Sequence, residues 1–455
     1  MVMVSIKSSS TVTPDQATPN VKLWLSECDQ IKPYTHAPFF YVYRPQQQAH
    51  NSIVSPLETL KSSLSHVLVP YYPLAGRLNW IGGGRFELNC NGMGAEMVEA
   101  ESESKVEDLG DFCPTPNTKK LLPQVDYTKD ISELPLLLVQ LTRFKCGGIS
   151  IGVAISHILV DGRGAFGFIS SWANFARGEN KLVVEPYHDR TVFYKGDPLA
   201  KPHFDHSDLK PSPTLIGQDS ADEERNKECT NRMLKLSKIQ VNKLQKLANE
   251  GRDATSRQYT RYESMAAHIW RCACKARKLQ NAQLTSLRIP VDCRNRFKPS
   301  LPPGYYGNAV MVPSPIAQVG KVLLGLGDAC RIISQAAGEF NDDYIKSSID
   351  FLASQEDLTQ LRTGFHTDGK KGRFIGNPNI TITSWFGLPI YDADFGWGKP
   401  IFMGPVGMGF DGKSYVIPGS DEDGSFVIPI RLQVTHMDDF EKLFYEDIPV
   451  RRAFL

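Results

Sequence analysis

The chain has 455 residues, of which 41% are hydrophobic and 22% are charged. This balance is typical of a globular protein with sizeable buried cores, and it excludes disorder over most of the length. Lysine and arginine number 51 against 50 acidic residues, so the formal charge of +1 supplies no global field for nucleic acid or an anionic membrane. We therefore expect two large domains and no nucleic-acid partner.

The nine cysteines are scattered along the chain, with neither a CxxC pair nor histidine partners at zinc spacing. They indicate reduced thiols in a cytoplasmic protein that binds no metal. Cys272 and Cys274 lie two apart in a predicted helix, where their side chains point to different faces, so we expect both to pack in the core. No apolar run reaches the length of a signal peptide or a membrane span, so we expect neither feature.

Two kinds of periodicity mark the first third of the chain. Apolar residues at helical spacing run over 57–67 and stop before Pro70, and an alternating segment over 85–88 indicates a strand. Two more strand-like runs, 136–145 and 149–157, are joined by a short glycine turn that suits a hairpin. A helix feeding a sheet is therefore predicted here.

His157 closes the second of these runs, on the same face as the isoleucine and valine residues before it, by the strand period of two. A polar residue is unusual in that place. After Asp161 the apolar residues return to helical spacing, and Gly178 is a plausible stop. A candidate functional histidine thus lies between the end of a strand and the start of a helix.

Residues 179–222 are polar and rich in proline, which indicates a long linker. It separates a predicted N-terminal domain over 1–178 from a C-terminal domain over 223–455. The second domain opens with a capping-box pattern at 237–240, and a further helix is predicted over 261–277. Strands and turns alternate beyond it, so the expected class is mixed α/β in two domains.

The string HILVDG places the imidazole of His157 four residues before the carboxylate of Asp161. A neutral histidine, with an ordinary pKa of about 6.5, can take a proton from an attacking hydroxyl or amine. The carboxylate can act indirectly, by fixing the backbone and the ring. HxxxD alone is common enough to arise by chance, so a histidine satisfied within the core remains an open alternative.

A second string, DFGWG, spans Asp394, Phe395, Gly396, Trp397 and Gly398. Two glycines around a tryptophan allow a sharp backbone path beside a large buried ring. The string holds no nucleophile, so a fixed structural loop is the interpretation that its residues favour.

Together the two strings resemble the signature motifs of the BAHD family of plant coenzyme A-dependent acyltransferases, which has HxxxDG near the middle and DFGWG near the C-terminus. The resemblance covers nearly the whole chain. Further matching segments are LKSSLS at 60–65, YPLAGRL at 72–78, YESMAAHIWR at 262–271, DCRNR at 292–296 and PPGYYGN at 302–308.

The resemblance implies two chloramphenicol-acetyltransferase-like domains, each a mixed sheet with flanking helices, joined by a long crossover loop for which 179–222 is the candidate. The active site would lie in a channel at the domain interface, with His157 in the middle. The resemblance implies no permanently bound cofactor. A p-coumaroyl-, caffeoyl- or feruloyl-CoA would serve as cosubstrate, and the enzyme would be a monomer.

The family mechanism implies that His157 removes the acceptor proton and that the acceptor attacks the thioester directly, without an acyl-enzyme. Asp161 resembles the family aspartate that turns away from the substrate and pairs with an arginine, for which Arg294 is the candidate. Trp385 and Thr383 match positions that stabilise the tetrahedral intermediate, as indole and hydroxyl donors can.

Other positions match family contacts less closely. Thr260 and Arg261 stand where the family contacts coenzyme A. The basic run 370–373 could touch the phosphates of the coenzyme, although a solvated loop is the alternative. His268 and His436 are expected in the core.

The acceptor is predicted from departures at the pocket, together with a resemblance to the spermidine hydroxycinnamoyl transferases. Thr363 occupies the place where transferases that acylate shikimate or quinate carry an arginine for the acceptor carboxylate, and Arg362 lies one step away. Ala37 and Phe39, close to Tyr41, stand where shikimate users often carry hydroxyl groups. Apolar walls suit the methylenes of a polyamine. The sequence therefore predicts a hydroxycinnamoyl-CoA:spermidine N-acyltransferase.

Three alternatives stay open. Asp350, Glu356 and Asp357 are candidates for holding the ammonium groups of a polyamine, but a solvated helix face is the favoured interpretation. The hypothesis of an O-acyltransferase for shikimate or quinate is revived if Arg362 takes the place of the missing arginine. A member without catalysis, which binds ligands or a partner through the same channel, is the third hypothesis.

Overall fold

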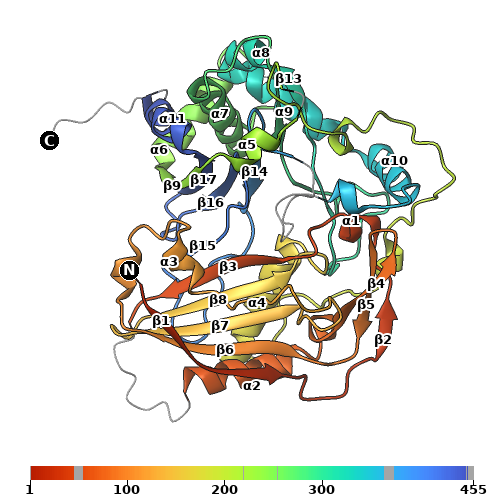
Figure 1. The fold of residues 1–455 in the computed structure, drawn as a ribbon, viewed down its shortest axis with the longest axis vertical. Helices are drawn as coiled ribbons and strands as arrows, with labels where there is room; N and C mark the ends of the chain where they lie inside the picture. Colours follow the sequence, from red (N-terminus) through yellow and green to blue (C-terminus); the bar gives the residue numbers. More distant parts are fainter. Residues whose placement is uncertain are drawn as a thin grey trace.

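The computed structural model describes residues 2–45, 55–218, 220–253, 255–362 and 374–446, together with residue 448. Within these ranges two six-stranded sheets dominate the molecule. Figure 1 shows the N-terminal half, coloured red to yellow, stacked against the C-terminal half, coloured green to blue. The predicted mixed α/β fold with two sheets is confirmed.

The first sheet has the strand order β1-β6-β7-β8-β3-β15, and only the β6–β7 pair is parallel. The predicted glycine hairpin is confirmed, because β7 and β8 pair antiparallel around Gly147, which has φ 84°. Every residue of β8 is buried, which explains its continuous apolar run. The bounds are β1 Val4–Val12, β6 Ala95–Ser102, β7 Leu137–Phe144, β8 Ile149–Ser156, β3 His36–Tyr43 and β15 Phe402–Pro405.

Two helices, α2 (Pro56–Val67) and α4 (Gly162–Ala176), pack against each other in the core of this half. The fully buried indole of Trp172 joins them, since its Nε1 donates to the Ser63 hydroxyl of α2 at 3.0 Å. Asp161 is the N-cap of α4, so the helix begins directly after the HxxxD string. His157, directly after β8, and the N-cap residue Asp161 are thereby fixed four residues apart.

The second sheet has the order β13-β10-β14-β16-β17-β9. Helix α7 covers one of its faces and is packed in turn by α6, α9 and α11. The predicted capping box at 237–240 and the helix predicted over 261–277 are confirmed as the start of α6 and as α7. The strands are β13 Ile316–Gln318, β10 Leu284–Arg288, β14 Ile380–Ser384, β16 Lys413–Pro418, β17 Phe426–Gln433 and β9 Cys229–Leu236; the helices are α6 Lys238–Ala248, α7 Arg261–Ala276, α9 Leu326–Glu339 and α11 Val434–Glu446.

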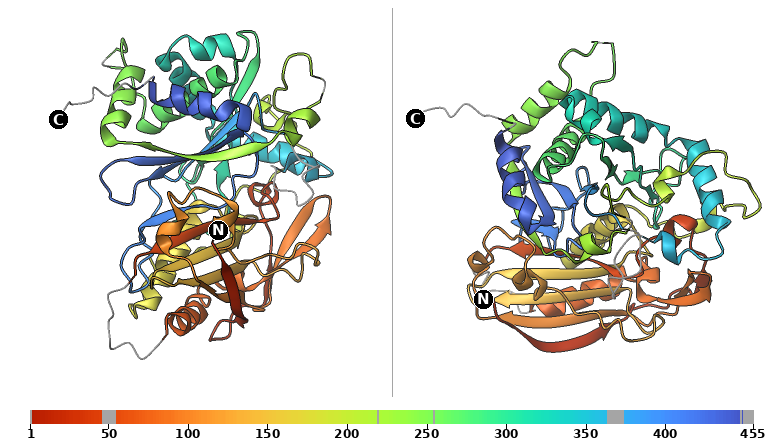
Figure 2. Two further views of the ribbon diagram at one scale, coloured as in Figure 1. Left: turned by 60° about the vertical axis from the view of Figure 1, so that its left-hand side comes forward. Right: turned by 45° about the horizontal axis from the view of Figure 1, so that its top comes forward.

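The two halves exchange chain at β15. After β14 the chain leaves the second sheet, pairs β15 with β3 in the first sheet, and returns as β16 (Figures 1 and 2). The segment 179–222 joins the halves along the outside and contains only short turns such as Arg190–Val192 before α5 (Asp222–Asn226). The sequence-based division at 178 and 222 stays a prediction, and it does not account for the exchanged strand.

Smaller elements complete the fold. A three-stranded sheet, β2-β5-β4, flanks the first half, and β11 pairs with β12 near the domain interface. None of the helices in the described ranges combines the length and the hydropathy that a membrane span needs. The remaining bounds are β2 Val21–Leu23, β4 Arg77–Gly82, β5 Arg85–Cys90, β11 Val291–Asp292, β12 Val310–Met311, α1 Glu27–Gln30, α3 Pro116–Lys119, α8 Val319–Leu323 and α10 Asp342–Ala353.

Candidate active site

A cavity of about 300 Å³ lies between the two sheets and is lined by residues of both halves. The N-terminal half contributes β3, the segment before it and the β8–α4 junction, and the C-terminal half contributes β10, β14 and β16. His157 lines this cavity, together with Asp161, Thr383 and Trp385. The fold therefore brings together the four residues predicted to take part in the chemistry.

His157 follows the last residue of β8, and its backbone is held on both sides. Its N–H donates to Thr35 O at 3.3 Å, and its carbonyl oxygen accepts from Asn308 Nδ2 at 3.0 Å. Within the described residues the buried Nδ1 has no hydrogen-bond partner. Burial and the nearby Lys32 ammonium lower the pKa of His157 to about 4. The imidazole is therefore neutral at neutral pH and can accept a proton.

Asp161 accepts hydrogen bonds from a dense set of donors. Arg294 donates to its two oxygens at 2.9 and 3.1 Å, and the backbone N–H groups of Ala309 and Gly164 donate at 3.0 and 3.2 Å. Burial by itself would raise the pKa of Asp161, but Arg294 and these donors outweigh it and hold the pKa below its usual value. This carboxylate is thus a fixed anion that fastens α4 to the C-terminal half.

A second buried network, which the motifs did not reveal, holds the backbone of His157. Asn308 Nδ2 donates to the carbonyl oxygens of both His157 and Ile158 at 3.0 Å. Asp29 accepts from the backbone N–H and the side chain of Asn308 at 2.7 and 2.9 Å, and it forms an ion pair with Arg190 at 3.2 Å. The segment PPGYYGN carried a signal for this site, because Asn308 is its last residue.

The opposite wall of the cavity is a face of the second sheet. Residues that pair across parallel strands share a face, and Arg288 pairs with Thr381, which pairs with Lys413. Thr383 and Tyr415 form the next pair on that face. All five side chains line the cavity. The alternating residues Leu287, Ile380, Ile382 and Val416 belong to the core on the other face.

Lys413 is a buried cation in this wall. Its Nζ donates to Thr383 Oγ1 at 2.6 Å and lies 4.4 Å from the centroid of the Tyr415 ring. Burial and the neighbouring Arg288 lower the pKa of Lys413 to about 7. Sequence analysis missed this residue, although Lys413 and Tyr415 alternate with buried Ser414 and Val416 as on a two-faced strand.

The residues predicted to form the acceptor pocket lie in different places. Ala37 and Phe39 line the cavity on β3. Tyr41, next on the same face, is only 1% exposed and is not among the lining residues. Thr363 and the basic run 370–373 lie outside the described residues.

Arg362 donates its hydrogen bonds to backbone oxygens outside the cavity. It is 2% exposed, its Nε donates to Gln30 O at 2.9 Å and its Nη2 donates to Gly84 O, while its guanidinium lies 4.7 Å from the centroid of the Phe86 ring. It does not line the cavity that contains His157. The alternative in which Arg362 takes the place of the missing carboxylate-binding arginine therefore loses its support.

Thr260 and Arg261 lie at the start of α7 and do not line the cavity around His157. The Thr260 side chain accepts from Glu263 N at 3.1 Å, as the N-cap of a capping box. Their contact with coenzyme A stays a prediction.

The DFGWG loop also lies away from the cavity lining. Asp394 Oδ1 accepts from Gly396 N and Gly398 N at 2.8 and 2.9 Å, and both glycines have positive φ, 98° and 84°. The Trp397 ring lies 5.6 Å from that of Tyr43 on β3. These contacts fix the loop just before β15, the strand that joins the two halves.

The carboxylates considered for a polyamine lie elsewhere. Asp350 accepts from the Tyr194 hydroxyl at 2.8 Å and from Asp197 N at 2.9 Å. Neither it nor Glu356 and Asp357 line the cavity around His157.

Two further histidines and the cysteines have structural surroundings. His268 is buried and bonded to Phe444 O at 2.9 Å, and His436 is partly buried on α11. None of the nine cysteines forms a disulfide, and Cys272 and Cys274 pack in the core as predicted. Within the described residues there is no cluster of histidine, cysteine or acidic side chains that could hold a metal ion.

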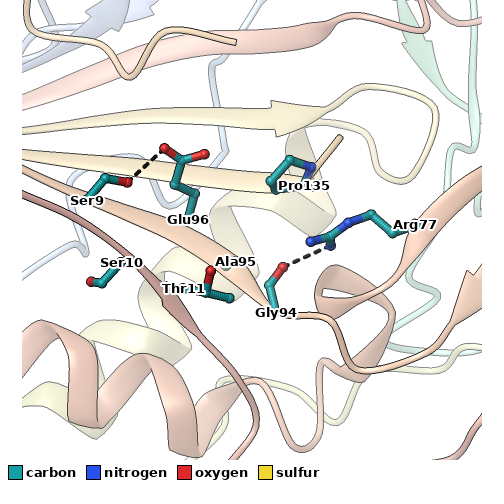
Figure 3. Close-up of a pocket in the computed structure, with 8 residues that line it drawn as sticks. All are labelled: Ser9, Ser10, Thr11, Arg77, Gly94, Ala95, Glu96 and Pro135. Atoms are coloured by element: carbon teal, nitrogen blue, oxygen red, sulfur yellow. Dashed lines mark hydrogen bonds between the residues drawn. The ribbon is translucent and has the colours of Figure 1, made fainter. Parts of the chain in front are cut away.

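A second cavity, of about 340 Å³, opens beside β1 and β6 (Figure 3). Its lining residues include neither histidine nor cysteine. Figure 3 shows the Arg77 guanidinium directed at Gly94, whose carbonyl oxygen it meets at 2.9 Å, and Ser9 bonded to Glu96 at 2.9 Å. These two hydrogen bonds join residues of the lining itself, and the cavity around His157 remains the candidate active site.

Comparisons with known proteins place the chain in a family. The profile of the Transferase family matches residues 2–447. The chain is 63% identical over 452 residues to hydroxycinnamoyl-CoA:piscidic acid hydroxycinnamoyltransferase of Actaea racemosa, covering 98% of this chain and 100% of that protein. It is 41% identical over 446 residues to shikimate O-hydroxycinnamoyltransferase of Nicotiana tabacum, covering 97% and 99%.

The fold is similar to that in the crystal structure of vinorine synthase, with a TM-score of 0.70, 23% identity and 96% of each chain covered. The family profile and the two relatives span nearly the whole chain, including both signature motifs. The chain therefore belongs to the Transferase family as a BAHD acyltransferase, an enzyme that uses an acyl-CoA as its cosubstrate.

Proposed function

We propose that this chain is a hydroxycinnamoyl-CoA-dependent O-acyltransferase whose acceptor is a hydroxylated carboxylic acid. The charge of the cavity around His157 carries the proposal. Among its described lining residues the carboxylates are Asp161 and Asp292, and Arg294 pairs with both of them. The cationic lining residues are Lys32, Arg163, Arg288, Arg294 and Lys413. Such a lining attracts an anion and repels the ammonium groups of a polyamine.

This proposal replaces spermidine as the acceptor expected from the sequence. The absence of an arginine at Thr363 predicts a pocket without a carboxylate partner. Two of the lining cations, Arg288 and Lys413, come instead from β10 and β16, and no sequence motif connects these strands with the pocket. The candidate polyamine carboxylates Asp350, Glu356 and Asp357 do not line that cavity.

The relatives support the same class of donor and acceptor. One is named for hydroxycinnamoyl-CoA and piscidic acid, and the other for O-acylation of shikimate. Both named acceptors are acids. The chain shares 63% of its residues with the first over essentially their full lengths. The cytoplasmic location and the monomeric state stay predictions.

In the proposed reaction His157 accepts the proton of the acceptor hydroxyl as its oxygen attacks the thioester carbonyl. The tetrahedral oxyanion collapses, the carbon–sulfur bond breaks, and the proton on His157 passes to the leaving coenzyme A sulfur. Because the charged Lys413 ammonium can only donate to Thr383, the hydroxyl hydrogen of Thr383 is free to donate to the oxyanion. Trp385 lines the same part of the cavity at the end of β14.

The other residues act through the backbone. Asp161 and Arg294 hold the turn after His157 against the C-terminal half, so we assign them a positioning role. The DFGWG residues fix β15 and thereby the joint between the halves. Neither group touches the reacting atoms in this proposal.

Product analysis tests the acceptor class directly. Purified protein is offered p-coumaroyl-, caffeoyl- and feruloyl-CoA, each with piscidic acid, shikimate, quinate, spermidine or putrescine in separate reactions, and products are identified by mass spectrometry. We expect hydroxycinnamoyl esters of at least one acid and no amide. Amides of spermidine without any ester would overturn the proposal in favour of the polyamine acceptor.

A further inference from the structure

We propose that Arg288, Thr381 and Lys413 form a subsite that binds a carboxylate group of the acceptor. The inference rests on the proposed O-acyltransferase function and assigns the recognition of its acid to one row of side chains. Such a site would decide which alcohols reach His157 in a productive orientation.

The row follows from strand register. Arg288 is the last residue of β10 and pairs with Thr381 on the adjacent parallel strand β14, and Thr381 pairs with Lys413, the first residue of β16. Three side chains from three neighbouring strands therefore stand side by side on the cavity face. Two cations flank one hydroxyl, and all three side chains can donate hydrogen bonds.

Lys413 has no counter-ion among the residues that the structure describes. It is 8% exposed, and among the described residues no carboxylate forms an ion pair with it. The charged group that acts on it is Arg288, which repels it. Its Nζ uses one donor for Thr383 Oγ1, which leaves two N–H donors for another acceptor. A buried ammonium in this setting is costly unless an anion joins it.

The other buried lysine of the cavity shows the contrast. Lys32 is 7% exposed, donates to Val310 O at 2.7 Å, and lies close enough to Asp161 and Asp29 for both carboxylates to raise its pKa, although burial lowers it overall. The described part of the chain thus supplies anions near Lys32 and none near Lys413.

Thr381 provides an independent sign of a missing ligand. Its side chain is 6% exposed, and its Oγ1 has no hydrogen-bond partner in the described structure. Buried hydroxyl groups normally have a partner, because burial without one costs free energy. This hydroxyl lies between Arg288 and Lys413, where a carboxylate held by the two cations would accept its hydrogen bond.

The position of the row favours the acceptor carboxylate over the phosphates of coenzyme A as the anion. Lys413 is close enough to His157 to lower the pKa of that histidine, so it lies near the reacting atoms. In the donor, the long pantetheine arm separates the phosphates from the thioester sulfur. An acceptor whose hydroxyl meets His157 can place its carboxylate against this wall.

Steady-state kinetics with Lys413→Met and Lys413→Arg test the subsite. The assay uses p-coumaroyl-CoA with piscidic acid and with shikimate, and KM is measured for donor and acceptor separately. We expect Lys413→Met to raise the acceptor KM, or to lower kcat/KM for the acceptor, by about 10- to 100-fold, because a hydrogen-bonded charge is lost. The donor KM should change less than about threefold, and Lys413→Arg should restore most of the loss.

The control is Lys399→Met, which removes a lysine from an exposed ion pair with Glu422 and should leave both KM values unchanged. An unchanged acceptor KM in Lys413→Met, with wild-type enzyme still esterifying acids, overturns the subsite alone. A rise confined to the donor KM assigns the cation to the phosphates of coenzyme A and also overturns it. A wild-type enzyme that acylates amines but no acid overturns the proposed function itself.

Discussion

The Asp161–Arg294 pair and the row of Arg288, Thr381 and Lys413 both place charge beside His157. Asp161 and Arg294 neutralise each other, whereas Lys413 has no carboxylate partner among the described residues. Asp161 is met by a bidentate guanidinium and two backbone N–H groups. Lys413 meets a hydroxyl oxygen, an aromatic ring and a second cation. The residues of both clusters line the same cavity.

This difference separates structural charge from ligand-binding charge. A compensated ion pair can hold two elements together without any ligand, as Asp161 and Arg294 do for α4 and the C-terminal half. A buried charge without a counter-ion lowers the stability of the free protein. Binding of an anion restores that stability. The predictions below test whether the two clusters differ in this way.

The largest effect on activity is expected at His157, which lines the cavity together with both clusters. His157→Ala should lower kcat by about 10²- to 10⁴-fold, because the general base is lost, while KM for p-coumaroyl-CoA stays within a few-fold. His66→Ala, which alters an exposed histidine of α2, is the matched control and should retain full kcat. Full activity of His157→Ala would end the proposed mechanism.

Breaking the compensated pair should unfold the enzyme more easily. Arg294→Met leaves the buried Asp161 without its main partner, so we expect the free energy of unfolding in urea to fall by about 3–5 kcal/mol. Arg163→Met removes a guanidinium from a largely exposed pair with Asp292 and should cost at most about 1 kcal/mol. Equal losses in the two variants would remove the distinction between a structural and a solvated pair.

Lys413 should instead give the free enzyme a stability that depends on pH. Its pKa falls from 10.5 to about 7 on folding, because of burial and Arg288. The folded state therefore binds fewer protons than the unfolded state between these values. The penalty of the buried cation is full below pH 7 and is lost as the pH rises toward 10.5, by up to about 1.4 kcal/mol per pH unit.

Urea unfolding of wild type and Lys413→Met across pH 7 to 10 measures this slope. The difference in unfolding free energy should favour the variant at pH 7 and shrink as the pH rises. The exposed-lysine variant Lys399→Met serves as the control. A difference that is constant with pH would show that Lys413 carries no buried charge.

The smallest effect is expected from the neutral member of the row. Thr381→Val keeps the shape and removes the hydroxyl, so the acceptor KM should rise by about 2- to 10-fold with the donor KM unchanged. Thr11→Val on the outer strand β1 provides a control far from the cavity. An acceptor KM equal to that of wild type would remove Thr381 from the subsite.

Local signals made much of the fold predictable. Helices α2, α4, α6 and α7 have apolar residues at helical spacing and polar caps, and the β7–β8 hairpin has its glycine turn. The exchanged strand β15 carries no such signal. Its partner β3 lies some 360 residues earlier in the chain, and strand pairing over that distance leaves no mark in either segment alone.

The residues of the site differ in the same way, because some carry a local sequence signal and others do not. His157 and Asp161 stand four apart in one motif, so the sequence located them without the fold. The row of Arg288, Thr381 and Lys413 comes from three strands far apart in the sequence, and only their register makes it visible. Lys413 also follows Asp411 and Gly412, where a lysine ordinarily indicates a solvated turn. The prediction of the acceptor therefore used Ala37, Phe39 and Thr363 and left this row out.

A competition assay tests the central claim, that this enzyme acylates a hydroxy acid and excludes a polyamine. Wild-type enzyme receives p-coumaroyl-CoA with piscidic acid, shikimate and spermidine at equal concentrations in one vessel, and mass spectrometry gives the ratio of ester to amide. The cationic row predicts hydroxycinnamoyl ester alone. A product mixture dominated by spermidine amide would contradict the account.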